Sequence, residues 1–244
     1  MRNQRLHWID PASAADAFPP VEVALKDPEG LLAVGGDLSP ERLLAAYRRG
    51  IFPWFVEGQP ILWWSPDPRC LFRPQAFHVS RSLRKALGRT PFTVTFNRDF
   101  EGVMRACAEP RPHQNGTWIT RDMLSAYTSL HETGWAHSIE ILDRDELVGG
   151  IYGLAIGRAF FGESMFSRRD NASKFAMLAL IDELTKRDFL VLDGQVESPH
   201  LLTLGAERMP RSSFIRLLDI ACDPEKPLTD LPGTEKPVGA VLSG

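Results

Sequence analysis

Two short apolar segments that each end in polar residues constrain the fold of this chain more than any other feature. The first covers residues 160–168 (FFGESMFSR), and the second covers residues 191–195 (VLDGQ). Residues 171–187, which lie between them, show the periodicity of a helix, so a strand, a helix and a second strand are predicted in that order. This order brings the ends of both strands to the same edge of a sheet. We therefore expect their polar residues to face one pocket with aromatic walls, as in sites of chemistry or recognition.

Three of these polar residues, Glu163, Asp193 and Gln195, are candidates for a functional site. A carboxylate can accept a proton from an amine, and an amide can both donate and accept hydrogen bonds. The pattern alone favours ordinary polar strand ends for Asp193 and Gln195. Glu163 either neutralises Arg168 or Arg169, or it receives a cationic group of a substrate.

The composition indicates a soluble globular protein that acts in a reducing compartment. Hydrophobic residues make up 43% and charged residues 24% of the 244 positions, and the net charge is −3. The longest apolar runs are far too short to span a bilayer, and the first residues lack the apolar core of a secretory signal. The three cysteines are widely spaced, and none of the six histidines has metal-ligand spacing. We therefore predict a cytoplasmic chain with no membrane partner and no metal site. We also expect a monomer.

The order of predicted elements indicates an α+β fold. In the second half of the chain, strands are expected at residues 138–142, 147–156 and 158–165, followed by a helix after Asn171 and a strand at residues 189–193. This β-β-β-α-β order is the one expected of an acetyltransferase-like (GNAT-like) acyltransferase. We therefore predict a small N-terminal α+β lobe over residues 1–90 and a larger C-terminal acetyltransferase-like lobe over residues 91–244.

Local signals predict how several segments begin and end. The first 38 residues are rich in proline and glycine and are expected to be irregular. Prolines and aromatic residues alternate over residues 51–68, which predicts rigid loops around short strands. The tail after Asp223 is expected to be poorly packed. Five residues are predicted to cap the helices that follow them, namely Ser39, Ser80, Asn97, Thr120 and Asn171.

Two tryptophans and a basic segment suggest a nucleic acid as partner. Trp54 and Trp118 stand in predicted loops, where a tryptophan either belongs to the core or stacks on a nucleobase. No acidic residue interrupts the basic residues between Phe72 and Asp99. Such a run is either a solvated face or a phosphate-binding patch. Its members are Arg73, Arg81, Arg84, Lys85, Arg89 and Arg98.

Nine short motifs occur in the same order as in one known protein family. They are GLLAVGGDLS (30–39), GIFPWF (50–55), ILWWSPDPR (61–69), GTWIT (116–120), HSIE (137–140), LVGG (147–150), GESMFSR (162–168), NASK (171–174) and DGQ (193–195). On these motifs, and over a match that runs from about residue 18 to residue 218, the chain resembles the leucyl/phenylalanyl-tRNA–protein transferases.

The resemblance implies the reaction and its partners. Members of the family move Leu or Phe, and also Met, from aminoacyl-tRNA to a protein whose N-terminal residue is Arg or Lys. The product enters the bacterial N-end-rule degradation route. The family's catalytic pair corresponds to Asp193 and Gln195, and its pocket glutamate corresponds to Glu163. The tryptophans that stack on the terminal adenosine correspond to Trp54 and Trp118.

The resemblance also implies an apolar pocket for the transferred side chain. Phe160 matches this pocket directly. Apolar residues that differ in part from those of the family occupy the other positions, which are Ile151, Met177, Leu180, Leu184 and Leu192.

An aminoacyl ester is already activated, so the implied transfer needs no ATP, coenzyme A or metal. The protein would position ester and amine, favour the neutral amine and stabilise the developing oxyanion. Three alternatives remain at this point. They are an acyl-coenzyme A acyltransferase, a transferase that acts on peptidoglycan precursors, and a tRNA-binding module without catalytic activity.

Overall fold

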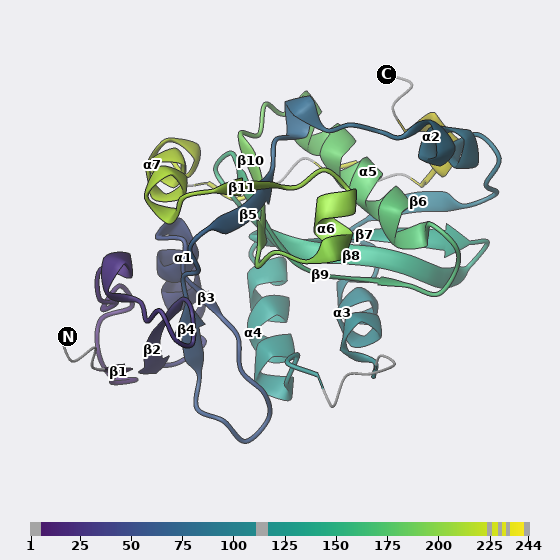
Figure 1. Cartoon of the computed structure of the whole chain (residues 1–244). Helices are drawn as coiled ribbons and strands as arrows, with labels where there is room; N and C mark the ends of the chain where they lie inside the picture. Colours follow the sequence, from purple (N-terminus) through teal and green to yellow (C-terminus); the bar gives the residue numbers. More distant parts are fainter. Residues whose placement is uncertain (1–5, 111–116, 224–225, 229–230, 233–234, 242–244) are drawn as a thin grey trace.

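A mixed sheet of eight strands forms the centre of the structure (Figure 1). The structure, a computed structural model, describes residues 6–110, 117–223, 226–228, 231–232 and 235–241. In spatial order the strands of this sheet are β11 (Glu207–Met209), β5 (Arg69–Phe72), β10 (Val191–Gln195), β9 (Ala159–Ser167), β8 (Glu146–Ile156), β7 (Ala136–Asp143), β6 (Thr93–Phe96) and β12 (Lys236–Pro237).

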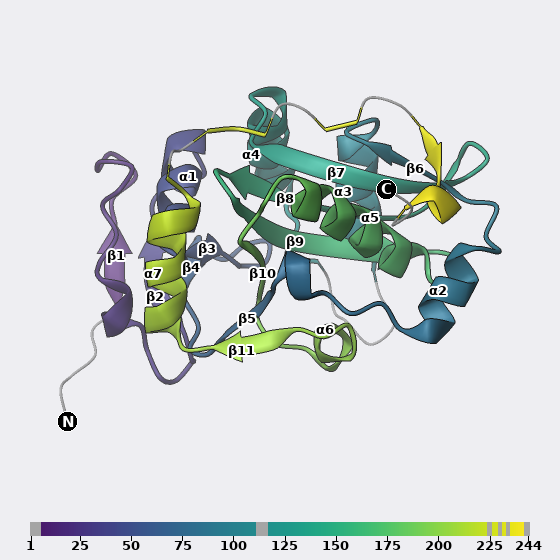
Figure 2. The same ribbon diagram turned by 90° about the horizontal axis from the view of Figure 1, so that it is seen from above.

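Helices cover both faces of this sheet (Figure 2). Helix α5 contacts strands β7, β8 and β9 from one side, and helices α3 and α4 pack on the other side, so two hydrophobic cores lie on opposite faces. Twelve of the fifteen residues of α5 are buried, because the helix lies deep in its core. The helices are α1 (Pro40–Arg48), α2 (Arg81–Leu87), α3 (Phe100–Ala108), α4 (Arg121–Glu132), α5 (Ala172–Lys186), α6 (Pro199–Thr203) and α7 (Arg211–Ala221).

A second, smaller sheet lies beside the first, together with helices α1 and α7 (Figures 1 and 2). Its order is β1 (His7–Ile9), β2 (Leu31–Gly35), β4 (Leu62–Trp64) and β3 (Phe52–Pro53). The N-terminal segment is largely irregular, as expected, but it also contains β1 and β2, which form a parallel pair. The aromatic and proline-rich segment does contain short strands, but the strand β5 that follows it was not predicted.

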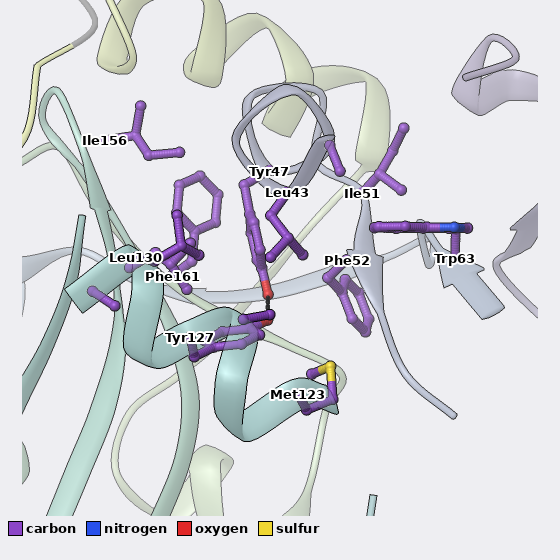
Figure 3. Close-up of a cluster of buried hydrophobic side chains, with 14 of the residues drawn as sticks. Leu43, Tyr47, Ile51, Phe52, Trp63, Met123, Tyr127, Leu130, Ile156 and Phe161 are labelled. Atoms are coloured by element: carbon purple, nitrogen blue, oxygen red, sulfur yellow. Dashed lines mark hydrogen bonds between the residues drawn. The ribbon is translucent and has the colours of Figure 1, made fainter. Parts of the chain in front are cut away.

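The α+β class is confirmed, whereas the division into two lobes stays a prediction. Strand β5 precedes residue 90 but pairs with β10 and β11 in the larger sheet. One hydrophobic core also contains residues from both sides of that boundary, such as Phe52, Tyr47 and Phe161 (Figure 3).

The capping signals are confirmed at two of the five helix starts. The side chains of Ser80 and Thr120 accept hydrogen bonds from the backbone of α2 and α4 respectively. Ser39 and Asn171 precede α1 and α5 without such a bond. The cap predicted at Asn97 is wrong. Asp99 caps α3 instead, because Asn97 has φ 58° and its side chain bonds to the backbone of Ser138.

The tail packs better than expected. Val238 and Val241 are buried in the core on the α5 side, and β12 adds to the edge of the larger sheet. Within the described residues, no helix is long and apolar enough to cross a membrane. All three cysteines, Cys70, Cys107 and Cys222, are buried and form no disulfide with one another.

The strand–helix–strand prediction is confirmed, and it determines where the site lies. Strands β9 and β10 are parallel neighbours, paired from Ala159 with Val191 to Phe161 with Asp193. Beyond these pairs both strands continue, but they no longer pair with each other. The carboxyl ends of β9 and β10 therefore separate and leave an opening in the sheet at the residues that the sequence singled out.

Candidate active site

A cavity of about 560 Å³ occupies the opening between β9 and β10. Phe160, Leu180 and Leu184 are buried in the core and do not line it. The other predicted catalytic and apolar residues form parts of its wall, namely Trp54, Trp118, Ile151, Glu163, Met177, Leu192, Asp193 and Gln195.

The carboxylate of Glu163 accepts hydrogen bonds from three neutral side chains. The hydroxyl of Tyr47 lies 2.7 Å from Oε1, and the amide Nε2 of Gln195 lies 2.8 Å from the same oxygen. The hydroxyl of Tyr127 lies 3.1 Å from Oε2. Tyr47 and Tyr127 also hydrogen-bond to each other across the interface between α1 and α4, as Figure 3 shows. No ion pair between described residues includes Glu163, so its charge has no cationic partner among them.

This arrangement prepares Glu163 to carry a proton near neutral pH. Burial raises the pKa of the Glu163 carboxyl to about 7, although its three hydrogen bonds favour the charged form. Glu163, Tyr47 and Tyr127 form three hydrogen bonds among themselves, and each of these bonds needs one proton. The two hydroxyls supply two protons when Glu163 is ionised, and a protonated Glu163 supplies the third. The site therefore accommodates both states of the carboxyl group.

Gln195 reaches Glu163 from an unusual backbone conformation. Its φ is 59°, in the left-handed region that side-chain-bearing residues seldom adopt. The backbone N–H of Gln195 donates to Oδ1 of Asp193 at 2.9 Å, which stabilises this bend. Asp193 is fully buried, and its two oxygens also accept bonds from the guanidinium of Arg69. Asp193 therefore holds the end of β10 in place, and its carboxylate is already occupied.

The alternative in which Glu163 neutralises an arginine is wrong. Arg168 pairs with Glu109, and Arg169 pairs with Glu146, 3.2 Å away. A second carboxylate of the cavity wall, Glu197, pairs with Arg208 at the surface. Glu163 is thus the unpaired acidic group of the cavity.

The two predicted stacking residues lie on the cavity wall and are accessible. Trp54 is 45% exposed, and Trp118 is half-buried. Trp54 packs against Trp64 with ring centroids 5.7 Å apart, and the indole N–H of Trp64 donates to the Trp54 carbonyl. These contacts fix the orientation of Trp54 and leave part of its ring free. The glycine that begins the GTWIT motif, residue 116, lies outside the described residues.

The predicted basic run divides into two parts. Arg73 forms an exposed ion pair with Glu207, and Arg98 forms one with Glu235. The remaining four members are exposed, lie on or just after α2, and form no ion pair with another described residue. They are Arg81, Arg84, Lys85 and Arg89.

Three functional side chains were not predicted. Tyr47 and Tyr127 are two of only three tyrosines in the chain, and both are fully buried. Their inward positions on α1 and α4 follow from helical periodicity, but their meeting at Glu163 does not. Arg69 directly precedes the apolar run Cys70–Phe72 on β5, and a charged residue next to a buried strand is a sequence signal that could have identified it.

Comparison with known proteins identifies the family. A family model described as "Leucyl/phenylalanyl-tRNA protein transferase" matches residues 71–219, and the model of its N-terminal domain matches residues 36–67. The chain belongs to the leucyl/phenylalanyl-tRNA protein transferase family. The family predicted from the nine motifs is thereby confirmed, and with it the class of enzyme, a transferase.

Relatives in this family cover most of the chain. The leucyl/phenylalanyl-tRNA–protein transferase of Cellvibrio japonicus is 56% identical over 211 residues, which is 86% of this chain and 89% of that protein. The protein of the same name from Pseudomonas syringae pv. syringae is 56% identical over 86% of this chain and 90% of its own length. A solved structure, that of L-PGS from Bacillus licheniformis, matches with 10% identity and a TM-score of 0.40 over 66% of this chain and 52% of that one.

Proposed function

We propose that this chain transfers Leu or Phe, and also Met, from aminoacyl-tRNA to the N-terminal Arg or Lys of an acceptor protein. The acceptor then enters the bacterial N-end-rule degradation route. Membership of the leucyl/phenylalanyl-tRNA protein transferase family supports the reaction class. The cavity between β9 and β10 carries the proposal for this chain, because apolar walls and an unpaired carboxylate meet there. We further propose that the chain acts as a monomer in the cytoplasm.

The reaction joins the acceptor's α-amine to the carbonyl carbon of the aminoacyl ester. The new C–N bond forms while the C–O bond to the terminal ribose breaks. The attacking nitrogen releases a proton as the amide forms, and the ribose oxygen takes up a proton and leaves as a hydroxyl. An N-terminal amine is largely protonated at neutral pH, with an ordinary pKa of about 7.7–8.0. The amine must therefore lose a proton before it attacks, and a base with a pKa near 7 suits that task.

We assign the proton-accepting role to Glu163. Its carboxylate is unpaired and half-buried and can hold a proton between Tyr47 and Tyr127. Gln195 orients the reacting groups with the part of its amide that Glu163 does not use. Asp193 contributes by holding Gln195, since both of its own oxygens are engaged within the protein. This division differs from a scheme in which Asp193 itself takes the proton.

Glu163 also explains the proposed choice of acceptor. A cationic N-terminal residue brings positive charge to the cavity, and a carboxylate without a partner favours it. The side chain of the acceptor's Arg or Lys therefore approaches Glu163, near the α-amine that reacts. Glu197 is the less suitable partner because Arg208 already neutralises it.

The donor would occupy the rest of the cavity and the surface that extends toward α2. Trp54 and Trp118 hold the terminal adenosine between them, and the wall formed by Ile151, Met177 and Leu192 receives the transferred side chain. The exposed cations of α2 bind the tRNA backbone. Helix α6 connects the two regions, since Leu201 lines the active-site cavity and Thr203 lines a hollow beside α2.

We also propose a two-lobe organisation in which the larger lobe is acetyltransferase-like. The two family models meet between residues 67 and 71, immediately before β5 joins the larger sheet. We therefore place the boundary at this point instead of at residue 90.

One assay tests the reaction. The chain is incubated with labelled Leu-tRNA and a peptide that begins with Arg, and the product is examined for leucine at the peptide N-terminus. Matched peptides that begin with Lys and Ala test the acceptor, and leucyl-adenosine replaces the tRNA in a second series. Binding of tRNA without transfer to any peptide would instead favour a binding module. Transfer from acyl-coenzyme A or to a peptidoglycan precursor would favour one of the other two alternatives.

A further inference from the structure

A buried ion pair lies next to the proposed reaction centre and contacts the backbone of Gln195. Arg69 on β5 and Asp193 on β10 are 1% and 0% exposed. Nε of Arg69 lies 2.9 Å from Oδ1 of Asp193, and Nη2 lies 2.6 Å from Oδ2. The guanidinium therefore holds the carboxylate with two parallel bonds, which fixes its orientation as well as its charge.

The rest of the guanidinium is constrained from three further directions. Its third nitrogen, Nη1, donates to the carbonyl of Gly50 at 3.0 Å. The rings of Phe52 and Phe214 each lie with their centroid 4.8 Å from the guanidinium carbon. Arg69 thus connects β10 with the end of α1, with β3 and with α7, and the shape of a guanidinium is required at every contact.

The effect of this pair is transmitted to Gln195. The register between β5 and β10 shifts between Asp193 and Gln195, so Gly194 is an extra residue in a bulge. Within the bulge, Oδ1 of Asp193 accepts both from Arg69 and from the backbone N–H of Gln195. The left-handed conformation of Gln195 depends on that second bond, and its amide then points at Glu163, 2.8 Å away.

We propose that Arg69 is a positioning residue for the transfer reaction, acting through Asp193 on the conformation of Gln195 and so on the Gln195–Glu163 contact. The inference rests on the proposed function. It separates two tasks within one motif: Asp193 and Arg69 form the support, while Gln195 and Glu163 face the substrates. A carboxylate held in this way orients the reacting groups without exchanging protons with them.

A purely structural ion pair is the competing explanation, and the chain offers a matched control. Arg42 is also 1% exposed, pairs with Asp37 at 3.1 Å and donates to three backbone carbonyls. It lies on α1 and does not contact Gln195, Glu163 or Asp193. Substitution of either arginine by lysine removes a planar fork from a buried site, so both variants should lose stability. Only Arg69→Lys should alter the chemistry in the folded state.

The test is a double-mutant cycle between Arg69 and Gln195. Transfer from Leu-tRNA to an Arg-peptide is measured at a temperature where circular dichroism shows every variant to be folded. Arg69→Lys should lower kcat at least about tenfold, since small misplacements of reacting groups have effects of this size or larger. The KM for Leu-tRNA should stay unchanged, and Arg42→Lys should keep the wild-type kcat. In a Gln195→Ala background, Arg69→Lys should lower kcat no further.

The outcomes separate the inference from the proposed function. No transfer by the wild-type chain would overturn the function, whereas active wild type with an unaffected Arg69→Lys variant would overturn only the role of Arg69. Equal losses of kcat with and without Gln195 would also overturn it, because Arg69 would then act independently. If Arg69→Lys does not fold, Phe214→Leu removes one ring from the guanidinium, and the same cycle applies with a smaller loss.

Discussion

The amide nitrogen of Gln195 lies 2.8 Å from Oε1 of Glu163, which joins two parallel strands at the point where their own pairing ends. No backbone hydrogen bond continues between β9 and β10 there, so a side-chain bond spans the opening. The same bond lies on the wall of the cavity that we assign to both substrates. A bond that closes a gap in a sheet and also faces the substrates should affect rate more than stability.

The first prediction concerns Gln195→Ala. Loss of the amide should lower kcat by about 100-fold or more, the range typical of a positioned polar group in proton transfer, while the chain stays folded. Alanine at a positive φ adds strain of its own, so Asp188→Ala serves as control. Asp188 has φ 55°, is exposed and lies after α5. If both variants had similar kcat values, the effect of Gln195→Ala would come from backbone strain and not from loss of the amide.

The second prediction concerns pH. Burial raises the pKa of Glu163 to about 7, and a proton acceptor must be ionised. Single-turnover transfer should therefore increase as pH rises through about 7 and then level off. The acceptor's own amine contributes a second rise near 8. Glu163→Gln should abolish the first rise and keep the second. A wild-type rate that follows only the amine titration would remove Glu163 from proton transfer.

The third prediction concerns the acceptor's positive charge. Glu163→Gln keeps the shape of the side chain and removes its charge, so the KM for Arg- and Lys-peptides should rise. A charge-assisted contact contributes about 1.5–3 kcal/mol, or roughly a tenfold to hundredfold change. Leu-tRNA binding should be unaffected. Glu197→Gln is the control, because it removes a neighbouring carboxylate that is already paired with Arg208. A larger effect at Glu197 would relocate the acceptor site.

The fourth prediction concerns the terminal adenosine. Trp54→Ala and Trp118→Ala should each weaken donor binding by about 1–3 kcal/mol, the usual contribution of a base stacked on an aromatic ring. Leucyl-adenosine should react with the wild-type chain and show the same loss in both variants. The matched control is Trp8→Ala, which removes an indole that is 65% exposed on β1, outside the cavity. Donor binding that tolerates both substitutions would place the adenosine elsewhere.

The fifth prediction concerns α2. The double substitution of Arg84 and Lys85 by Glu should raise the KM for Leu-tRNA and reduce the slope of log affinity against log salt by about 1 for each lost phosphate contact. Reaction with leucyl-adenosine should not change. Lys26 and Arg216, both exposed and distant in sequence from α2, provide the same change of charge as a control. An equal loss in the control would indicate a general effect of net charge.

The sequence was a good guide wherever one local rule decides the outcome. Periodicity and caps located α2 and α4, and the strand–helix–strand order correctly predicts that Glu163 and Gln195 lie close together. A parallel pair joined by a helix has few alternative arrangements, so this inference was secure. The capping error at Asn97 arose because a side-chain bond to a distant strand competes with the local cap.

The same reasoning could not predict contacts between residues that are far apart in the sequence. Tyr47 and Tyr127 stand 80 positions apart, and 124 positions separate Arg69 from Asp193. No periodicity relates the members of such pairs, since only the packing of α1 on α4 and of β5 on β10 brings them together. Asp193 was correctly located at the site, yet its burial and its partner change the role that its residue type suggested.

Cys70 lies directly opposite Gln195 in the register of β5 and β10, so a thiol stands immediately behind the proposed reaction centre. Burial raises the pKa of that thiol to about 11, and Cys107 and Cys222 are buried as well. The thiolate of an accessible cysteine attacks peroxide and maleimides, and the folded chain exposes none of its three. The activity of the transferase should therefore persist after treatment with a maleimide, because the folded chain offers this reagent no accessible thiol.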